Sequence, residues 1–221
     1  MFLCSVSDMH GNLDFDIEPC DLLLIAGDIL PCNYRNLTMA CAQQEQFIKY
    51  NFIPWLEKQP FKECVFISGN HDWIFEISPS LVPNLPSNVH YIQDSQIEIE
   101  GLKIYGTPQQ PIFRNWAFNR TPSQLEIYFE QIPEGLDILL SHTAPYKIMD
   151  KVNFHNYKGH EGCKILKKRI KKIKPKYVIF GHFHGQYGIE KKDYMGNITF
   201  INCSLLNENY KMTKKPIYRS I

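Results

Sequence analysis

The chain has 221 residues, of which 44% are hydrophobic and 21% charged, and its formal net charge is +1. At about 100–200 residues per domain, this length predicts one domain over residues 1–221, and the composition excludes a disordered tail, a collagen-like repeat and a coiled coil. The near-neutral charge gives no overall field that would attract nucleic acid or an anionic membrane.

The sequence also lacks the patterns typical of membrane and secreted proteins. Its apolar runs, such as residues 22–27, are far shorter than the roughly 20 residues that cross a bilayer. Met1 leads into a strand-like run without the basic start of a signal peptide. The seven cysteines form no C-x-x-C pair, which is typical of reduced, buried thiols. We therefore expect a cytoplasmic protein with no membrane partner, and the oligomeric state is left open.

Short apolar runs recur along the chain, with helical segments between them. Five runs are continuous rather than alternating, as in strands covered on both faces, and they span residues 1–7, 22–27, 64–69, 138–141 and 177–181. Helices are predicted over residues 38–55, 122–131 (with Thr121 as its cap) and 162–174. Residues 89–106 alternate around Gly101 and predict a hairpin in a second sheet, to which residues 198–203 add a strand. The predicted fold class is α/β, with two sheets flanked by helices.

Polar residues follow each of the five continuous strands. The segments at these strand ends are Asp8-Met9-His10, Gly27-Asp28, Gly69-Asn70-His71-Asp72, Ser141-His142 and Gly181-His182-Phe183-His184. In open α/β sheets, ligands bind at the carboxyl ends of the strands, and glycine lets the backbone turn sharply there. We therefore expect these side chains to meet at one site.

The chemistry of this set favours metal ions. Nitrogen and oxygen donors without a thiolate suit two divalent ions such as manganese, iron or zinc, and magnesium less well; two such ions form the known clamp for displacement at phosphorus. The candidate ligands are Asp8, His10, Asp28, Asn70, His142, His182 and His184, with Asp28 as the candidate bridge. The alternative is that each motif is an ordinary turn, but five of the eight histidines would then follow strands by chance.

The ordered motifs D-M-H-G, G-D, G-N-H-D, S-H and G-H-F-H resemble the calcineurin-like metallophosphoesterases, whose fold is an α/β/β/α double-sheet sandwich with a dinuclear metal site at the strand ends. The resemblance implies two divalent ions, manganese first, with iron, zinc, nickel or magnesium as alternatives. It implies that one ion is held by Asp8, His10, Asp28 and His184, and the other by Asp28, Asn70, His142 and His182. It also implies that His71 faces the phosphate and that Asp72 orients His71.

Further segments resemble the MPPED-type branch of that family. They are Y-G-T-P at 105–108, W-A-F-N at 116–119, I-P-E-G-L-D-I-L-L-S-H at 132–142 and P-K-Y-V-I-F-G-H-F-H-G-Q-Y-G at 175–188. The H-E-G-C stretch at 160–163 also resembles this branch and would place His160 near the pocket, unless His160 only starts a helix. Asn119 and Arg120 are expected in a nucleobase-binding loop, with core packing as the alternative for the aromatic residues beside them.

The resulting hypothesis is a metal-dependent phosphodiesterase that hydrolyses small phosphodiesters, such as cyclic nucleotides, through a hydroxide bridging the two ions. Asp28 is followed by Ile29-Leu30-Pro31 rather than by the V-D-R-G segment of protein phosphatases. Without that phosphate-gripping arginine, a singly charged diester is favoured over a monoester. The alternatives are a nuclease acting on DNA or RNA, a phosphomonoesterase and a non-catalytic scaffold. Near-neutral charge disfavours the nuclease, and the basic residues of 163–176 are interpreted as a solvated helix face.

Overall fold

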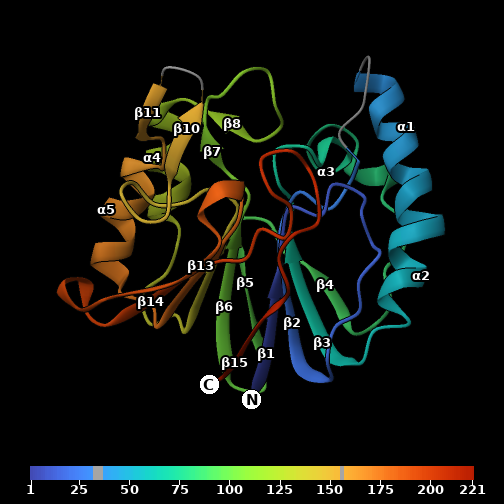
Figure 1. Ribbon diagram of the computed structural model, residues 1–221, viewed down its shortest axis with the longest axis horizontal. Coiled ribbons are helices and arrows are strands. Elements are labelled where there is room, and N and C mark those ends of the chain that lie inside the picture. The colour runs from blue at the N-terminus through green and yellow to red at the C-terminus, as the bar shows by residue number, and fades with distance from the viewer. Residues whose placement is uncertain (32–36, 155–156) are drawn as a thin grey trace.

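Two β-sheets packed face to face form the centre of the computed structural model, which describes residues 1–31, 37–154 and 157–221 (Figure 1). The first sheet contains β1 (Phe2–Val6), β2 (Cys20–Ala26), β3 (Phe61–Ile67), β4 (Val89–Tyr91) and β15 (Ile217–Ser220). The second contains β5 (Ser95–Ile99), β6 (Leu102–Thr107), β9 (Ile138–Ser141), β12 (Tyr177–Phe180), β13 (Gly188–Lys192) and β14 (Ile198–Asn202). Their orders are β15-β1-β2-β3-β4 and β13-β14-β12-β9-β6-β5.

The central strands of both sheets are parallel, and antiparallel strands lie at the edges. Strands β1 to β4 are parallel to their neighbours, as are β6, β9, β12 and β14, whereas β15, β13 and β5 pair antiparallel. Two small ribbons stand apart, β7 (Gln110–Pro111) with β8 (Asn119–Arg120), and β10 (Lys151–Phe154) with β11 (Tyr157–His160). Because parallel strands all run the same way, their carboxyl ends meet at one end of each sheet.

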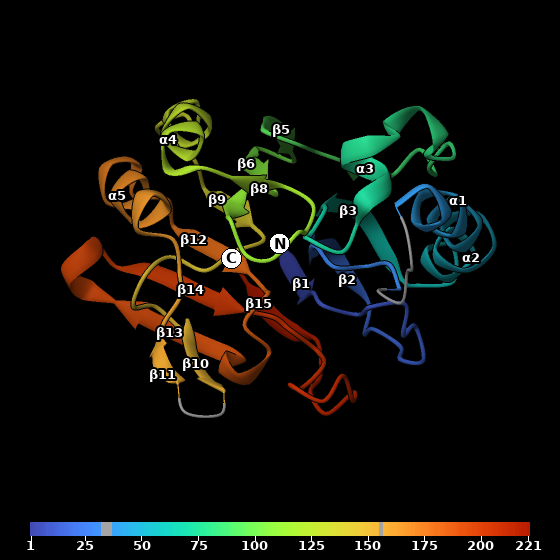
Figure 2. The ribbon, with the colours of Figure 1, turned by 90° about the horizontal axis from the view of Figure 1, so that it is seen from above.

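Helices cover the outer face of each sheet (Figure 2). The helices α1 (Leu37–Phe47), α2 (Ile53–Leu56) and α3 (Trp73–Ile77) lie beside the first sheet, and α4 (Pro122–Glu130) and α5 (Lys164–Ile173) beside the second. The arrangement confirms the predicted α/β/β/α double-sheet sandwich.

The apolar strands contribute side chains to the cores on both faces of each sheet. In β2, Leu22 and Leu24 face the core between the two sheets, whereas Leu23 and Ile25 face the core under α1 and α2. A strand that is buried on both faces shows no polar alternation, which is why these runs are continuous in the sequence.

The helix α5 buries the stripe that its spacing predicts. Leu166, Ile170 and Ile173 are buried against the second sheet, and the basic residues occupy the remaining surface of the helix. One of these basic residues, Arg169, also makes a contact within the fold: its guanidinium donates to the backbone carbonyl of Ile132 in the segment after α4.

Two predicted elements differ from the structure. The expected hairpin over residues 89–106 is only the β5–β6 pair around Gly101, because β4 joins the first sheet beside β3. A three-residue strand is too short to show a period, and Asp94, with a φ of 47°, turns the chain from one sheet to the other. The single helix over residues 38–55 is α1 and α2 joined by a π-helical turn (Ile48–Phe52), since Pro54 has no N–H to continue an α-helix.

No helix within the described parts of the chain is long and apolar enough to cross a membrane. Six cysteines of these parts are buried, free thiols, as their spacing predicts, and Cys32 lies outside the described residues.

Candidate metal centre

The candidate ligands come from the carboxyl ends of both sheets. Asp8 follows β1, Asp28 follows β2 and Asn70 follows β3, all in the first sheet. In the second sheet, His142 follows β9, and His182 and His184 follow β12. The site therefore lies at the seam where the ends of the two sheets meet.

Backbone geometry at these strand ends is unusual. Asp8, His10, Asp28 and His182 have φ values of 53°, 44°, 51° and 67°. Positive φ is uncommon outside glycine and costs of order 1–3 kcal/mol per residue, and it persists only where surrounding contacts hold it. Here it makes the chain turn sharply after β1, β2 and β12, so that these side chains point at the seam.

Two glycines allow the backbone to approach the carboxylates closely. A Cβ atom at Gly181 would overlap Oδ2 of Asp8, and one at Gly69 would overlap Oδ1 of Asp28. Glycine is therefore required directly before His182 and before Asn70, because a larger residue would collide with the carboxylates of the site.

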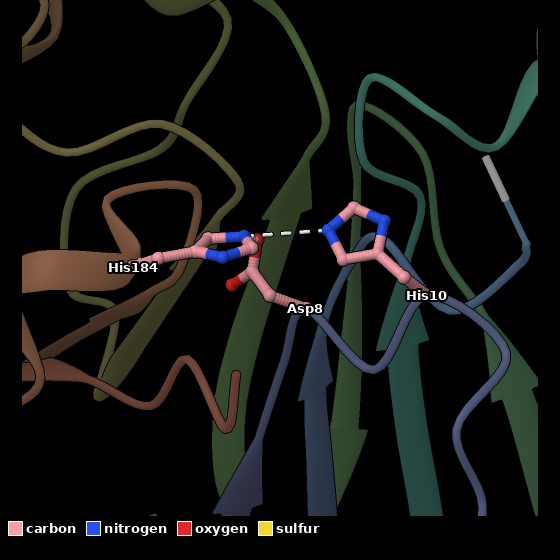
Figure 3. A group of neighbouring side chains, drawn as sticks. All are labelled: Asp8, His10 and His184. Atoms are coloured by element: carbon pink, nitrogen blue, oxygen red, sulfur yellow. Dashed lines mark hydrogen bonds and ion pairs between the residues drawn. The ribbon is translucent and has the colours of Figure 1, made fainter. Parts of the chain in front are cut away.

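The first group of donors is Asp8, His10 and His184, shown in Figure 3. Nε2 of His184 lies 3.3 Å from Oδ1 of Asp8 and 3.3 Å from Nε2 of His10. The other nitrogen of His184, Nδ1, is 3.0 Å from the carbonyl oxygen of Asn207. A carbonyl at one ring nitrogen fixes the imidazole so that the other nitrogen faces the site, as in metal-binding histidines.

The second group is Asp28, His142 and His182. Nε2 of His142 lies 3.4 Å from Oδ2 of Asp28 and 3.0 Å from Oδ1 of Asn70, and its Nδ1 is 2.9 Å from the carbonyl oxygen of Ala26. The same Oδ2 of Asp28 is 3.6 Å from Nε2 of His10. One carboxylate oxygen therefore faces both groups.

These separations fit bound metal ions. Two donors that each lie about 2.0–2.1 Å from one ion are roughly 3.0–3.4 Å apart, and the facing nitrogens of His10 and His184 are 3.3 Å apart. In His10, Nε2 is the nitrogen that faces the other donors, whereas Nδ1 is buried without a hydrogen-bond partner among the described residues. The donor atoms are nitrogen and oxygen, which suit divalent ions of borderline hardness.

Electrostatics at the site are dominated by the two buried carboxylates. Burial opposes their ionisation, but the hydrogen bond and charge of His184 hold the pKa of Asp8 below its ordinary value, and the charge of His142 does the same for Asp28. Burial lowers the pKa of His10 to about 4 and that of His182 to about 3. The carboxylates of Asp8 and Asp28 are therefore ionised, and the imidazoles of His10 and His182 are neutral, which is the protonation state that metal ligands need.

His142 and His184 differ from these two imidazoles. Burial disfavours the charged form of each, yet the hydrogen bond and charge of Asp8 raise the pKa of His184, and the charge and hydrogen bond of Asp28 raise the pKa of His142 to about 9. Without a metal ion, a proton on His142 thus balances the negative charge of Asp28, and binding a cation there releases that proton.

Residues 5–186 match the calcineurin-like phosphoesterase family. The chain belongs to this family. It is 33% identical to the UPF0046 protein T07D4.2 of Caenorhabditis elegans over 98% of this chain, and it spans 58% of that protein's length. It is 30% identical to the human metallophosphoesterase domain-containing protein 1 over 98% of this chain and 69% of that protein, which supports the predicted MPPED-type branch. Membership implies a metal-dependent phosphoesterase.

A solved structure supports the fold. The crystal structure of TT1561 from Thermus thermophilus matches with a TM-score of 0.57 and 13% identity, over 91% of this chain and 88% of that chain.

His71 lies directly beside the candidate ligands. Its backbone N–H donates to Oδ1 of Asp28 at 2.7 Å, and its ring centroid lies 4.7 Å from that of His10 and 4.0 Å from that of Trp116. Nδ1 of His71 is buried without a hydrogen-bond partner among the described residues. His71 also forms a group with His10 and Asp28 that is close enough to hold an ion, so its expected role opposite the phosphate stays a prediction.

Asp72 has a different set of contacts from the one that the family resemblance implied. Its carboxylate accepts from the backbone N–H groups of Leu30, Gly69 and Ile29 at 2.9, 2.7 and 3.3 Å, and the described hydrogen bonds include none to the ring of His71. Burial and the nearby charge of Asp28 raise the pKa of Asp72 to about 7. Asp72 therefore joins the loops after β2 and β3, and its expected role in orienting the His71 ring stays a prediction.

The expected substrate-binding residues Asn119 and Arg120 have internal partners. The Asn119 side chain donates to the carbonyls of Phe113 and Arg114. Arg120 pairs with Glu76 at 2.7 Å and lies over the ring of Tyr128. These contacts shape the loop between β7 and β8, and they favour a structural role for both residues.

His160 lies on β11 and not at a helix start, since α5 begins at Lys164 with Cys163 as its N-cap. Its Nδ1 is 2.5 Å from Oδ1 of Asp150. It lines a cavity of about 590 Å³ that also includes Gly185 and Gln186, the two residues after His184.

A set of supporting residues, mostly in the C-terminal segment, escapes prediction from the sequence. The hydroxyls of Ser7 and Ser204 donate to Oδ2 of Asp8 at 2.6 and 2.7 Å. The ring of Tyr210 lies edge-on to His10 and His184, with centroids 4.9 and 5.2 Å away. Serine and tyrosine in a loop carry no local signal, and contacts between residues distant in the sequence, such as the bridge between Ser7 and Ser204, bring this segment to the site.

Proposed function

We propose that this chain is a phosphodiesterase that hydrolyses small phosphodiesters, such as cyclic nucleotides, at a centre for two divalent ions, manganese first. The observation that carries the proposal is the position of Asp28, whose Oδ2 is 3.6 Å from Nε2 of His10 and 3.4 Å from Nε2 of His142. One ion would be held by Asp8, His10, Asp28 and His184, and the other by Asp28, Asn70, His142 and His182. When bound, such ions supply a water of lowered pKa and neutralise charge on the phosphoryl oxygens.

The remaining chemistry belongs to side chains next to these ligands. Asn70 contributes a neutral oxygen, so the ligand set carries only the two carboxylate charges and leaves the loaded centre attractive to an anion. His71 is placed to stabilise charge on the phosphoryl group or to give a proton to the leaving oxygen. Its backbone bond to Asp28 fixes where the residue sits relative to the ligands.

The internal partners of the nearby cationic side chains favour a diester as the substrate. Nζ of Lys214 donates to the carbonyls of His184 and Leu206, and Arg120 pairs with Glu76. Neither provides a guanidinium or ammonium group ready to grip a doubly charged monoester. A diester carries one negative charge and depends less on such a residue.

A substrate panel with manganese-loaded protein tests this proposal. We expect hydrolysis of bis-p-nitrophenyl phosphate and of a cyclic nucleotide, with slower turnover of p-nitrophenyl phosphate and single-stranded DNA. Asp28→Asn should abolish these activities, because the residue faces both groups. His90→Gln is the matched control, since His90 pairs with Glu63 on the first sheet and not with the ligands.

Each contrary result has a distinct meaning. Preference for p-nitrophenyl phosphate would make the protein a phosphomonoesterase, and preference for DNA or RNA would make it a nuclease. Full activity in Asp28→Asn would show that the centre built around this carboxylate is not the catalytic site.

A further inference from the structure

The β10–β11 hairpin presents a polar face to a cavity beside the candidate metal centre. In this antiparallel pair, Lys151 lies opposite His160, and Asn153 lies opposite Lys158. Directly opposed residues, and residues two apart on one strand, share a face of the ribbon. These four side chains therefore point the same way, and all four line the cavity of about 590 Å³.

The cavity adjoins the loop that carries His184. Its opposite wall includes Gly185 and Gln186, which directly follow His184, and Glu208, which follows Asn207. Asn207 is the residue whose carbonyl holds Nδ1 of His184. The strand β10 contacts the short turn His184–Gln186, and the hairpin lies at the same end of the sandwich as the strand carboxyl ends (Figure 1).

His160 is held in a fixed orientation inside this cavity. Asp150 is fully buried, and its Oδ2 accepts the backbone N–H groups of Lys147 and Gly162 at 2.8 and 2.9 Å. Its Oδ1 lies 2.5 Å from Nδ1 of His160. Because Asp150 takes Nδ1, Nε2 is the ring nitrogen left to meet a ligand in the cavity.

The lining of the cavity selects for a polar anion. Lys151 and Lys158 bring two positive charges against the single carboxylate of Glu208, and Asn153 and Gln186 add amide groups. Among the described residues, the lining includes no phenylalanine, tyrosine or tryptophan, so a nucleobase would find no ring there on which to stack. Lysine and histidine donors around an open, polar space are suited to a phosphate group.

We propose that this cavity binds the second ester arm of the substrate, and that this arm carries a further phosphate group held by Lys151, Lys158 and Nε2 of His160. The inference rests on the proposed phosphodiesterase function and narrows its substrate class to acyclic diesters, since a cyclic nucleotide carries no second phosphate group. A diester with its reacting phosphorus at the ligand loops extends past Gly185 into the cavity, where the second phosphate lies between the hairpin and the turn after His184.

Two substrates with one leaving group test this inference. They are 2-phosphonoethyl p-nitrophenyl phosphate and n-butyl p-nitrophenyl phosphate, which differ only in the arm that stays on phosphorus. With manganese-loaded protein at low salt, we expect kcat/KM to be about tenfold higher for the phosphonoethyl substrate, mainly through KM. This preference should shrink as sodium chloride is added, because exposed charges are screened.

Variants assign the preference to the cavity. Lys151→Gln combined with Lys158→Gln should reduce the kcat/KM ratio of the two substrates to near one, and His160→Gln should lower it severalfold. Lys171→Gln is the matched control, because Lys171 is exposed on α5 and does not line the cavity, and it should keep the wild-type ratio. Circular dichroism of each variant checks that the fold is kept.

The outcomes separate this inference from the function on which it rests. Hydrolysis of both substrates at equal kcat/KM, or a ratio that survives the double lysine variant, overturns the cavity assignment and leaves the phosphodiesterase intact. Hydrolysis of neither substrate overturns the proposed function, and this inference with it.

Discussion

Asp8 shows how one residue becomes a fixed anion in a protein interior. Two serine hydroxyls donate to its Oδ2, and the backbone N–H of His182 is 3.0 and 2.9 Å from its two oxygens. Hydrogen bonds to a charged acceptor are roughly twice as strong as neutral ones, and they offset both the burial and the positive φ at this position. A carboxylate held in this way is suited to be a metal ligand and not a proton donor.

His71 is the residue whose role is most open to experiment. We expect His71→Ala to lower turnover of a nucleotide diester by about 10²–10⁴-fold, because proton transfer from a positioned side chain contributes that much. Manganese content, measured by elemental analysis, should stay near that of the wild type. A substrate with p-nitrophenolate as its leaving group should lose less, since that oxygen needs little protonation.

The control for this variant is His90→Ala, which removes an imidazole far from the ligands and should leave both substrates unaffected. Equal losses on both substrates would mean that His71 stabilises phosphoryl charge. Loss of manganese would make His71 a ligand, in line with its proximity to His10 and Asp28.

At the scale of residues, the sequence predicts what is encoded locally. The donors converge because each follows a strand, and strand ends share an edge of the sheet. The roles of Asn119 and Arg120 depend on where Phe113 and Glu76 lie after folding, and the sequence carries no signal for those contacts.

The elements that carry the ligands depend on close backbone approach at the end of β12. We expect Gly181→Ala to lose at least one equivalent of manganese and most of the activity, because the added methyl group overlaps the carboxylate of Asp8 and the hydroxyl of Ser7. Elemental analysis and the rate on bis-p-nitrophenyl phosphate measure these losses.

Gly101→Ala is the matched control for this substitution. Gly101 has a φ of 85° in the β5–β6 turn and no atom within 4 Å of the added Cβ, so alanine there strains the backbone without touching the site. It should lower the free energy of unfolding by about 1 kcal/mol or somewhat more and keep the metal. If Gly181→Ala also keeps its metal, the close approach at Asp8 is not a requirement of the centre.

Element prediction succeeded where hydrophobic periodicity is strong and failed where the chain changes sheets. The apolar stripe of α5 and the continuous run of β2 each define a buried face by themselves. Strand β4 does not define a buried face by itself. Its three residues form a strand because they pair with β3. The N-cap of α4 is a local feature: Thr121 caps the helix as predicted, and Gln124 completes a capping box with it.

The whole molecule places its candidate metal centre across two sheets. Asp8, Asp28 and Asn70 belong to the first sheet, whereas His142, His182 and His184 belong to the second. The contacts between the sheets elsewhere are apolar, through residues such as Leu24 and Leu140. A ligand bound at the seam therefore contacts both halves of the sandwich at once, and it favours the folded chain over the unfolded one.

This arrangement predicts that metal ions stabilise the entire fold. An ion present at 100 times its Kd adds about 2.7 kcal/mol to the free energy of unfolding, and for a chain of this size each kcal/mol raises Tm by about 2–4 °C. We therefore expect manganese to raise the Tm of chelator-treated protein by about 5–10 °C in differential scanning calorimetry. Asp28→Asn should remove most of this shift, because its carboxylate faces both groups, whereas His90→Gln should show the full shift. A wild-type Tm that is unchanged by manganese would mean that the seam holds no ion.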